Sequence, residues 1–440
     1  MTNAHEPSTA SAAPPRNDPF AAMREPNYRF FAFAFVASSM GLQMLSTAIG
    51  WEIYERTNDA FMLGLTGLAR ALPVIALTLP AGTIVDRSDR KKVLAITQMC
   101  FGLVAVALAA ASWSHAPVWV FFAMLVVSGS VRSFNAPSRG ALLPSLLPPA
   151  RFENAIAWQS GFFQFAAVAG PLLAGVLMAA IGGAWLVYAI TAALCMCAGV
   201  AALFLKPRPV ERTGAPPRFR DMLAGAHHIW REKTILGALT LDLLAVLFGG
   251  ATALLPVYAK MLGVGEIGLG ALRAAPFVGA FLMAVWLAAR PTFRHAGFAL
   301  LSSVAGFGVC MIVFGLSRSL WLSLLALAVS GALDNISVVI RHVLVQMRTP
   351  DHMRGRTTAV NAVFIESSNE IGAFESGLVA RFFGPVFSVV SGGIGTLAVV
   401  VFVAWAFPAL RSMRQLTESR EDVRHAEEES EEHRRLGTEG

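Results

Sequence analysis

The 440-residue chain has 55% hydrophobic and only 14% charged residues, and its mean hydropathy is +0.59. A soluble domain has about a quarter charged residues, so this composition excludes an ordinary soluble protein. The net charge of +7 would suit nucleic-acid binding, but the basic residues are spread over short loops between apolar runs and form no continuous stripe. We therefore interpret them as the cytoplasmic loops of a membrane protein.

Long apolar runs predict twelve membrane-spanning helices, because each run is long enough to cross a hydrocarbon core about 30 Å thick. In chain order, the expected helices are residues 29–54, 61–85, 93–112, 118–137, 155–180, 184–205, 235–258, 269–289, 298–316, 320–344, 359–381 and 386–407. The first six form an expected N-terminal bundle (29–205), and the last six form a C-terminal bundle (234–410). Because Pro144, Pro148 and Pro149 interrupt it, segment 139–154 is predicted to be a loop.

Three segments lie outside the two bundles. Residues 1–28 are polar, lack a signal-peptide pattern and are expected to be a disordered cytoplasmic N-terminus. Residues 206–233 are expected to be a cytoplasmic linker, whose apolar residues at helical spacing predict an amphipathic helix on the membrane face. Residues 411–440 form a charged tail, also expected in the cytoplasm. With the N-terminus inside, most basic loop residues fall on the cytoplasmic side, which supports the topology independently.

One loop carries a specific motif. It reads Gly82-Thr-Ile-Val-Asp86-Arg87-Ser-Asp89-Arg90-Lys91-Lys92, and this pattern resembles the signature loop between helices 2 and 3 of the major facilitator superfamily. The resemblance implies an all-α integral membrane fold, with twelve transmembrane helices in two pseudo-symmetric six-helix bundles. It also implies that the loop is a conformational gate in which Asp86 accepts hydrogen bonds from a helix N-terminus and pairs with an arginine. A purely topogenic basic loop is the alternative, and it leaves Asp86 unexplained.

The two halves of the chain repeat one another. Residues 67–73 align with residues 270–276, and both stretches lie in the second helix of their half. Residues 149–160 similarly echo residues 350–361 after the fourth helix. This pattern predicts a parallel duplication with the substrate site between the halves. The second half resembles the exporter branch of the family that includes the enterobactin exporter, over residues 241–250, 273–280 and 368–377.

Two further stretches resemble family motifs in part. Arg132 begins Arg-Ser-Phe-Asn-Ala-Pro, which resembles the helix-4 motif R-x-x-Q-G; this implies an influence on proton coupling, and a structural ion pair is the alternative. In the fifth helix, Gly170, Pro171 and Gly175 resemble the end of the antiporter motif G-P-x-x-G-G, which favours export over uptake. The alternative for these three residues is ordinary close packing of helices.

Ionisable residues inside apolar helices are costly and frequently functional. The candidates for a proton or substrate pathway are Glu52, Arg132, Asp242, Asp334, Arg341, Glu366 and Glu370. Glu366 and Glu370 are four residues apart and therefore share a helix face. Two such carboxylates in a low dielectric resist ionising together, so one of them would carry a proton. Arg70 and Arg273 occupy equivalent repeat positions and are interpreted as structural partners.

These features favour a monomeric, proton-coupled exporter of an amphipathic small molecule, siderophore- or drug-like, in a bacterial inner membrane. Its partners would be that substrate, protons and the lipid bilayer. Uptake of a small metabolite and a non-transporting sensor remain as alternatives. No catalytic motif or nucleotide loop is recognisable, so the sequence indicates neither an enzyme nor ATP as the energy source. The four cysteines lie inside apolar runs, and no metal or other cofactor is indicated.

Overall fold

The structure, a computed structural model, describes residues 18–208, 227–289, 295–350, 353–411 and 413. Within these residues, every regular element is a helix. The predicted disorder of residues 1–17, most of the predicted amphipathic linker helix (209–226) and most of the charged tail (414–440) lie outside the described residues. The side chain of Glu366 also lies outside this description, although its backbone belongs to a helix.

The first half of the chain folds into six long helices, because its apolar runs can satisfy their backbone polar groups in lipid only as helices. They are α1 (Pro26–Thr57), α2 (Ala60–Arg87), α3 (Arg90–Trp113), α4 (Val118–Leu146), α5 (Phe152–Ile181) and α6 (Trp185–Leu203), with the short η1 (Pro149–Arg151) before α5.

The second half repeats this order. Its elements are α8 (Lys233–Gly249), η2 (Ala251–Leu254), α9 (Leu255–Met261), α10 (Gly265–Ala288), α11 (Ala296–Leu316), α12 (Leu320–Arg348), α13 (Arg354–Phe383), α14 (Pro385–Ala406) and the short α15 (Pro408–Arg411). By length and composition, 11 helical stretches of the described residues can cross a membrane, with α8, η2 and α9 counted as one. The more polar α13, at 30 residues, is the twelfth.

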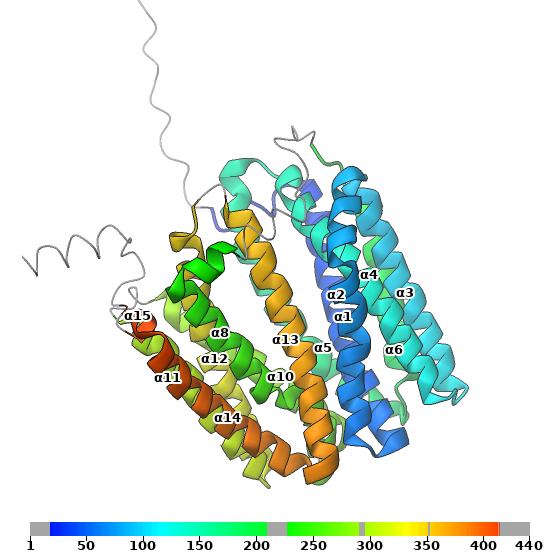
Figure 1. Cartoon of the computed structure of the whole chain (residues 1–440). Helices are drawn as coiled ribbons and strands as arrows, with labels where there is room; N and C mark the ends of the chain where they lie inside the picture. Colours follow the sequence, from blue (N-terminus) through cyan, green and yellow to red (C-terminus); the bar gives the residue numbers. More distant parts are fainter. Residues whose placement is uncertain (1–17, 209–226, 290–294, 351–352, 412, 414–440) are drawn as a thin grey trace, which may run out of the picture.

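The helices pack as two six-helix lobes with matching contacts (Figure 1). In the N-terminal lobe α3 packs on α6 and α2 packs on α4, and in the C-terminal lobe α11 packs on α14 and α10 packs on α12. Between the lobes, α2 contacts α13 and α10 contacts α5, which are equivalent pairs under exchange of the halves. The arrangement confirms the pseudo-symmetric duplication that the internal repeat predicts.

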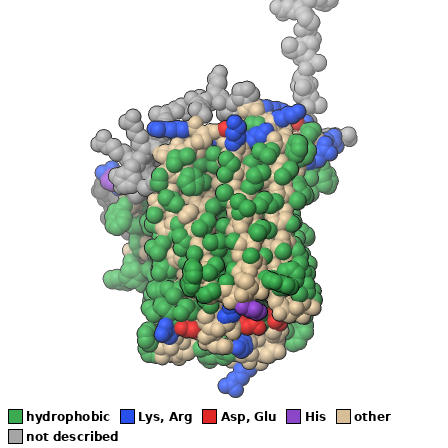
Figure 2. Space-filling model, turned by 90° about the vertical axis from the view of Figure 1, so that its right-hand side faces the viewer, with side chains coloured by type: hydrophobic (Ala, Val, Ile, Leu, Met, Phe, Trp, Pro, Cys, Tyr) green, Lys and Arg blue, Asp and Glu red, His purple; other side chains and the backbone are tan. Residues whose placement is uncertain are grey.

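A broad apolar surface surrounds the middle of the molecule. Figure 2 shows hydrophobic side chains between one end rich in Lys and Arg and another end of mixed charge. Large apolar side chains near the edges of this surface include Trp321, Trp405 and Phe298, which are 79%, 78% and 69% exposed. A soluble protein does not leave so much contiguous apolar surface in water. We therefore place this surface against lipid.

The structure corrects the prediction of a loop over residues 139–154. Helix α4 continues through Pro137 and Pro144 to Leu146, and α5 already begins at Phe152. Prolines are tolerated inside membrane helices because side-chain hydroxyls and neighbouring helices compensate for the freed backbone groups. The residue after each proline also bonds within the helix: the hydroxyl of Ser138 donates to the carbonyl of Phe134 at 2.7 Å, and that of Ser145 donates to the carbonyl of Leu142 at 2.6 Å.

The structure also differs from the predicted N-terminal disorder over residues 18–28. Glu25 pairs with Arg151 at 2.6 Å, and the indole of Trp158 donates to the carbonyl of Pro19 at 2.8 Å. The backbone N–H of Ala22 donates to the side chain of Asn154 at 3.0 Å. Residues preceding α1 therefore pack against the start of α5 because this polar segment finds specific partners there.

Candidate functional site

The molecule has two ends, which we name by their loops. The signature end contains the turn at Ser88 and Asp89 between α2 and α3, and the far end contains the turn at Asn58 and Asp59 between α1 and α2. In Figure 1 the two lobes converge toward the far end, at the bottom of the view. The position of the contacts between the lobes decides which end is closed.

Small residues bring the lobes into backbone contact near the far end. A Cβ added at Gly67 of α2 would lie 2.7 Å from the carbonyl oxygen of Glu370 in α13, and one added at Gly377 would lie 2.6 Å from the Cα of Gly64. On the other side of the interface, a Cβ at Gly175 of α5 would lie 2.5 Å from the carbonyl oxygen of Glu266 in α10. Only glycine permits such an approach.

Polar contacts join the same end of the lobes. Asp59 forms an ion pair with Arg381 at 3.6 Å, and Lys260 hydrogen-bonds to Asn58. The guanidinium of Arg273 donates to the carbonyl and the hydroxyl oxygens of Ser46 at 3.0 and 2.9 Å. These contacts connect α1 and α2 with elements of the C-terminal lobe, so the far end is closed in this conformation.

Toward the middle of the helices, a hollow lies between the lobes. Its lining comes from α2, α4 and α13 and consists of Arg70, Ala71, Val74, Ile75, Arg132, Ser367 and Glu370. Arg70 and Glu370 form an ion pair at 3.3 Å across the interface between the lobes. Two of the predicted pathway residues, Arg132 and Glu370, therefore line one space. Arg70, expected from the sequence only as a structural partner, lines it too.

Three other predicted pathway residues form a cluster inside the C-terminal lobe. Asp242 of α8 pairs with Arg341 of α12, and both side chains are buried. Asp334 lies two turns before Arg341 on α12, interacts electrostatically with Asp242 and Arg341, and has an exposed side chain. The cluster thus places two carboxylates near one guanidinium.

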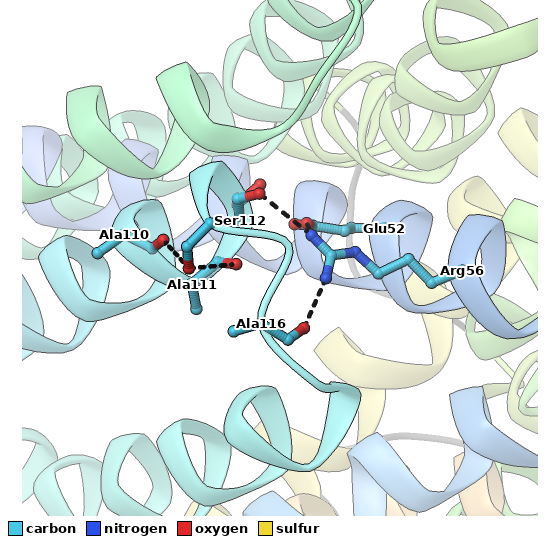
Figure 3. A network of polar contacts seen from close by, with 7 residues as sticks. Glu52, Arg56, Ala110, Ala111, Ser112 and Ala116 are labelled. Carbon is cyan, nitrogen blue, oxygen red and sulfur yellow. Dashed lines mark hydrogen bonds and ion pairs between the residues drawn. The ribbon is translucent and has the colours of Figure 1, made fainter.

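The remaining acidic candidate of the N-terminal lobe, Glu52, lies apart from the hollow. Figure 3 shows Arg56 between Glu52 and the backbone of the turn joining α3 to α4. Arg56 donates to the carbonyl oxygens of Ala116 at 2.8 Å and Ser112 at 3.3 Å. This network connects α1 to the end of α3 and to the following turn, within one lobe at the far end. Its geometry is that of a structural ion pair.

The signature loop is exposed at the opposite end. Asp86 lies 3.9 Å from Arg90, and Arg90 donates to the carbonyl of Ala141 in α4 at 3.1 Å. The N-terminus of α3 is capped by Asp89, which accepts from the N–H groups of Lys91 and Lys92. A Cβ at Gly82 would meet no described atom within 4 Å. Arg87 is exposed and Lys91 is half-buried. The loop therefore makes contacts within its own lobe in this conformation.

The helix-5 motif is divided between two interfaces. A Cβ at Gly170 would lie 2.8 Å from the side chain of Gln43 in α1, within the N-terminal lobe. Pro171 and Gly175 instead face α10, where the carbonyl oxygen of Pro171 would lie 2.5 Å from a Cβ at Gly270. The sequence predicts close packing here but does not reveal that the partner is the other lobe.

Sequence reasoning missed the residues that connect the two lobes at the far end, namely Asp59, Lys260 and Arg381. They lie in turns or at helix ends, where single charges are ordinary. The internal repeat was the available signal for Arg70 and Arg273. In the structure, both arginines contact the opposite lobe, Arg70 through Glu370 and Arg273 through Ser46.

Taken together, the fold defines a multi-pass membrane protein of two pseudo-symmetric six-helix lobes with a polar hollow between them. Residues 31–373 match the Major Facilitator Superfamily. The chain belongs to this family, which indicates a transporter of small molecules rather than an enzyme.

Comparison with known proteins agrees with this assignment. The chain is 24% identical over 391 residues to the protein named enterobactin exporter EntS from Shigella boydii serotype 4. This match covers 89% of the present chain and 94% of the exporter. The protein of the same name from Escherichia coli O81 has the same identity and coverage. A crystal structure of a bacterial homolog of the human lysosomal transporter Spinster matches with a TM-score of 0.67, 15% identity, and 92% and 100% of the two chains covered.

Proposed function

We propose that the protein exports an amphipathic small molecule, siderophore- or drug-like, in exchange for protons, by alternating access. The observation that carries this proposal is the hollow between two lobes whose far end is closed by glycine contacts and ion pairs. The similarity to enterobactin exporters supports export. In the proposed cycle, the lobes of residues 29–205 and 234–410 rock about the hollow, and the linker of residues 206–233 joins them.

The charge distribution supports the orientation that export requires. The signature end carries Arg87, Arg90, Lys91, Lys92, Arg151 and Arg348. Such an excess of Arg and Lys is typical of cytoplasmic loops. We therefore orient the signature end and both termini toward the cytoplasm of a bacterial inner membrane. The closed far end then faces outward, and substrate reaches the hollow from the cytoplasm. We propose that one chain is sufficient for this cycle.

We assign the proton to the cluster of Asp242, Asp334 and Arg341. One guanidinium can compensate only one of the two carboxylates, and an uncompensated charge at membrane depth is costly. A proton on the second carboxylate removes this charge. Asp334 is the better carrier because it is exposed, whereas Asp242 is buried against Arg341. Glu370 is already paired with Arg70.

We propose that the signature loop acts when the signature end closes and the far end opens. Among the described residues, Asp86 pairs with Arg90, and a Cβ at Gly82 would meet no atom within 4 Å. Closure of the signature end would bring the C-terminal lobe toward this loop. We propose that Asp86, together with Arg87, Arg90 and Lys91, then stabilises the closed signature end.

The decisive experiment compares cells with and without the gene by untargeted metabolite profiling of cytoplasm and medium. Export predicts a compound that accumulates inside the deletion strain and is depleted from its medium; the opposite distribution would establish uptake. That compound is then added to everted vesicles carrying a proton gradient. The wild-type protein should dissipate the gradient, and Asp334→Asn should not. The matched control, Glu153→Gln on the exposed start of α5, should behave as wild type.

A further inference from the structure

The hollow between the lobes combines cationic and apolar lining. Arg70 and Arg132 contribute guanidinium groups, Glu370 contributes a carboxylate, and Val74 and Ile75 contribute apolar surface. Charged and apolar side chains therefore line the same hollow.

Arg70 uses only part of its hydrogen-bonding capacity. A guanidinium has five N–H donors in a planar fork, but Arg70 meets Glu370 through Nη2 alone, at 3.3 Å. Its Nε is buried and has no hydrogen-bond partner among the described residues. A buried donor without an acceptor costs free energy. The guanidinium of Arg70 can therefore accommodate a second hydrogen-bond acceptor in addition to the carboxylate of Glu370.

The formal charge around the hollow is also positive. Arg70 and Arg273 contribute two positive charges, and Glu370 on α13 contributes one negative charge. Arg273 belongs to this set because it interacts electrostatically with both Arg70 and Glu370, while its hydrogen bonds go to the neutral Ser46. One positive charge is left over in the middle of the membrane, where an anion would compensate it.

We propose that this hollow binds the acidic group of an amphipathic organic anion, such as a carboxylate, sulfonate or ionised phenol. The acidic group takes the place of Glu370 on Arg70, and the apolar part of the molecule lies against Val74 and Ile75. This inference rests on the proposed function and specifies its substrate class. Because Arg70 and Glu370 belong to different lobes, the exchange removes one contact that keeps the far end closed. Substrate binding thereby favours the opening that releases it outward.

The test is equilibrium binding to purified full-length protein in nanodiscs of neutral lipid, with naphthalene-2-carboxylate and its uncharged carboxamide as matched probes. The wild-type protein should bind the carboxylate about tenfold more tightly than the carboxamide, since hydrogen bonds to charged groups are the stronger kind. Arg70→Gln should bring the ratio of the two affinities close to one. Glu370→Gln should raise the affinity for the carboxylate severalfold, because it removes the competing charge and leaves Arg70 in place.

The matched control is Arg381→Gln. It also removes an ion pair between the lobes, at the far end and outside the hollow, and should leave the ratio of affinities unchanged. The inference is overturned if the wild-type protein fails to prefer the carboxylate or if Arg70→Gln leaves the ratio of affinities unchanged. It is also overturned if Glu370→Gln lowers the affinity for the carboxylate. If Arg70→Gln does not fold, Glu370→Gln decides alone. The assay involves no transport, so the two claims can fail separately. Export without a preference for the carboxylate would refute only this inference. A preference for the carboxylate without export would refute only the proposed function.

Discussion

At the scale of single residues, three carboxylates inside the described helices are each paired with one arginine. Glu52 is matched by Arg56, Asp242 by Arg341, and Glu370 by Arg70. The first two pairs lie within one lobe, and the third connects the lobes. This difference separates residues that look equivalent in the sequence: a pair within a lobe stabilises that lobe, and a pair between lobes would have to break in the proposed transport cycle.

The pair of Asp242 and Arg341 gives a stability prediction. Arg341→Ala leaves Asp242 buried without its partner, and breaking a buried pair costs about 3–5 kcal/mol. We expect a lower midpoint of thermal unfolding in detergent for this variant. Arg341→Met combined with Asp242→Asn should recover much of the loss, because it leaves no unpaired charge. Arg318→Ala, at an exposed turn, serves as the control and should unfold as wild type. Equal midpoints for all variants would show that the pair is not a stabilising contact.

At the scale of elements, glycine positions determine how closely helices of opposite lobes approach. The interface of α2 with α13 depends on Gly64, Gly67 and Gly377, and that of α5 with α10 depends on Gly175 and Gly270. These two interfaces are equivalent under the pseudo-symmetry of the fold. Together they seal the far end on both sides of the central hollow.

The α2–α13 interface gives a conformational prediction. Gly67→Ala places a methyl group 2.7 Å from the carbonyl oxygen of Glu370 and 3.0 Å from the side chain of Ala373. Overpacking of this kind costs about 1–3 kcal/mol, and here the cost falls only on the closed far end. Spin labels at residues 57 and 383 should therefore show a larger population of long distances. Gly161→Ala on α5, where a Cβ meets no described atom within 4 Å, should leave the distance distribution unchanged and controls for the substitution itself.

At the scale of the whole molecule, the two lobes are similar structures that meet through a limited set of contacts. The far end is held by Asp59 with Arg381, Lys260 with Asn58, and the glycine contacts. Transport by alternating access requires these contacts to form and break in every cycle. Contacts inside a lobe, such as that of Trp113 with Trp185 at 5.0 Å between ring centroids, can persist throughout.

Chemical crosslinking tests this distinction. In a variant without native cysteines, Asp59→Cys with Arg381→Cys should be joined by a short reducible thiol crosslinker, and transport should stop until a reductant is added. Trp113→Cys with Trp185→Cys, crosslinked in the same way within the N-terminal lobe, should continue to transport. Full activity of the first crosslinked protein would refute movement of the far end as part of the cycle.

The sequence by itself determined the class of fold. Twelve apolar runs, the signature loop and the repeat of residues 67–73 at 270–276 define two six-helix lobes, because lipid permits an apolar segment of this length only one backbone structure. It also identified most of the polar candidates, since a charged residue in an apolar run is conspicuous. The loop expected at residues 139–154 was wrong because the effect of proline on a helix depends on its neighbours, and the sequence does not show them.

Only the tertiary structure decided which charges meet. Glu370 looked like the partner of Glu366, yet it pairs with Arg70, which is 300 residues away in the chain and in the other lobe. Glu52 looked like Asp242, yet it belongs to a network at the end of one lobe. Periodicity fixes the face of a helix on which a residue lies, but the partner of that face depends on how helices pack across the lobes. Those long-range contacts leave no local pattern, so the hollow and the closed far end could be found only in the folded molecule.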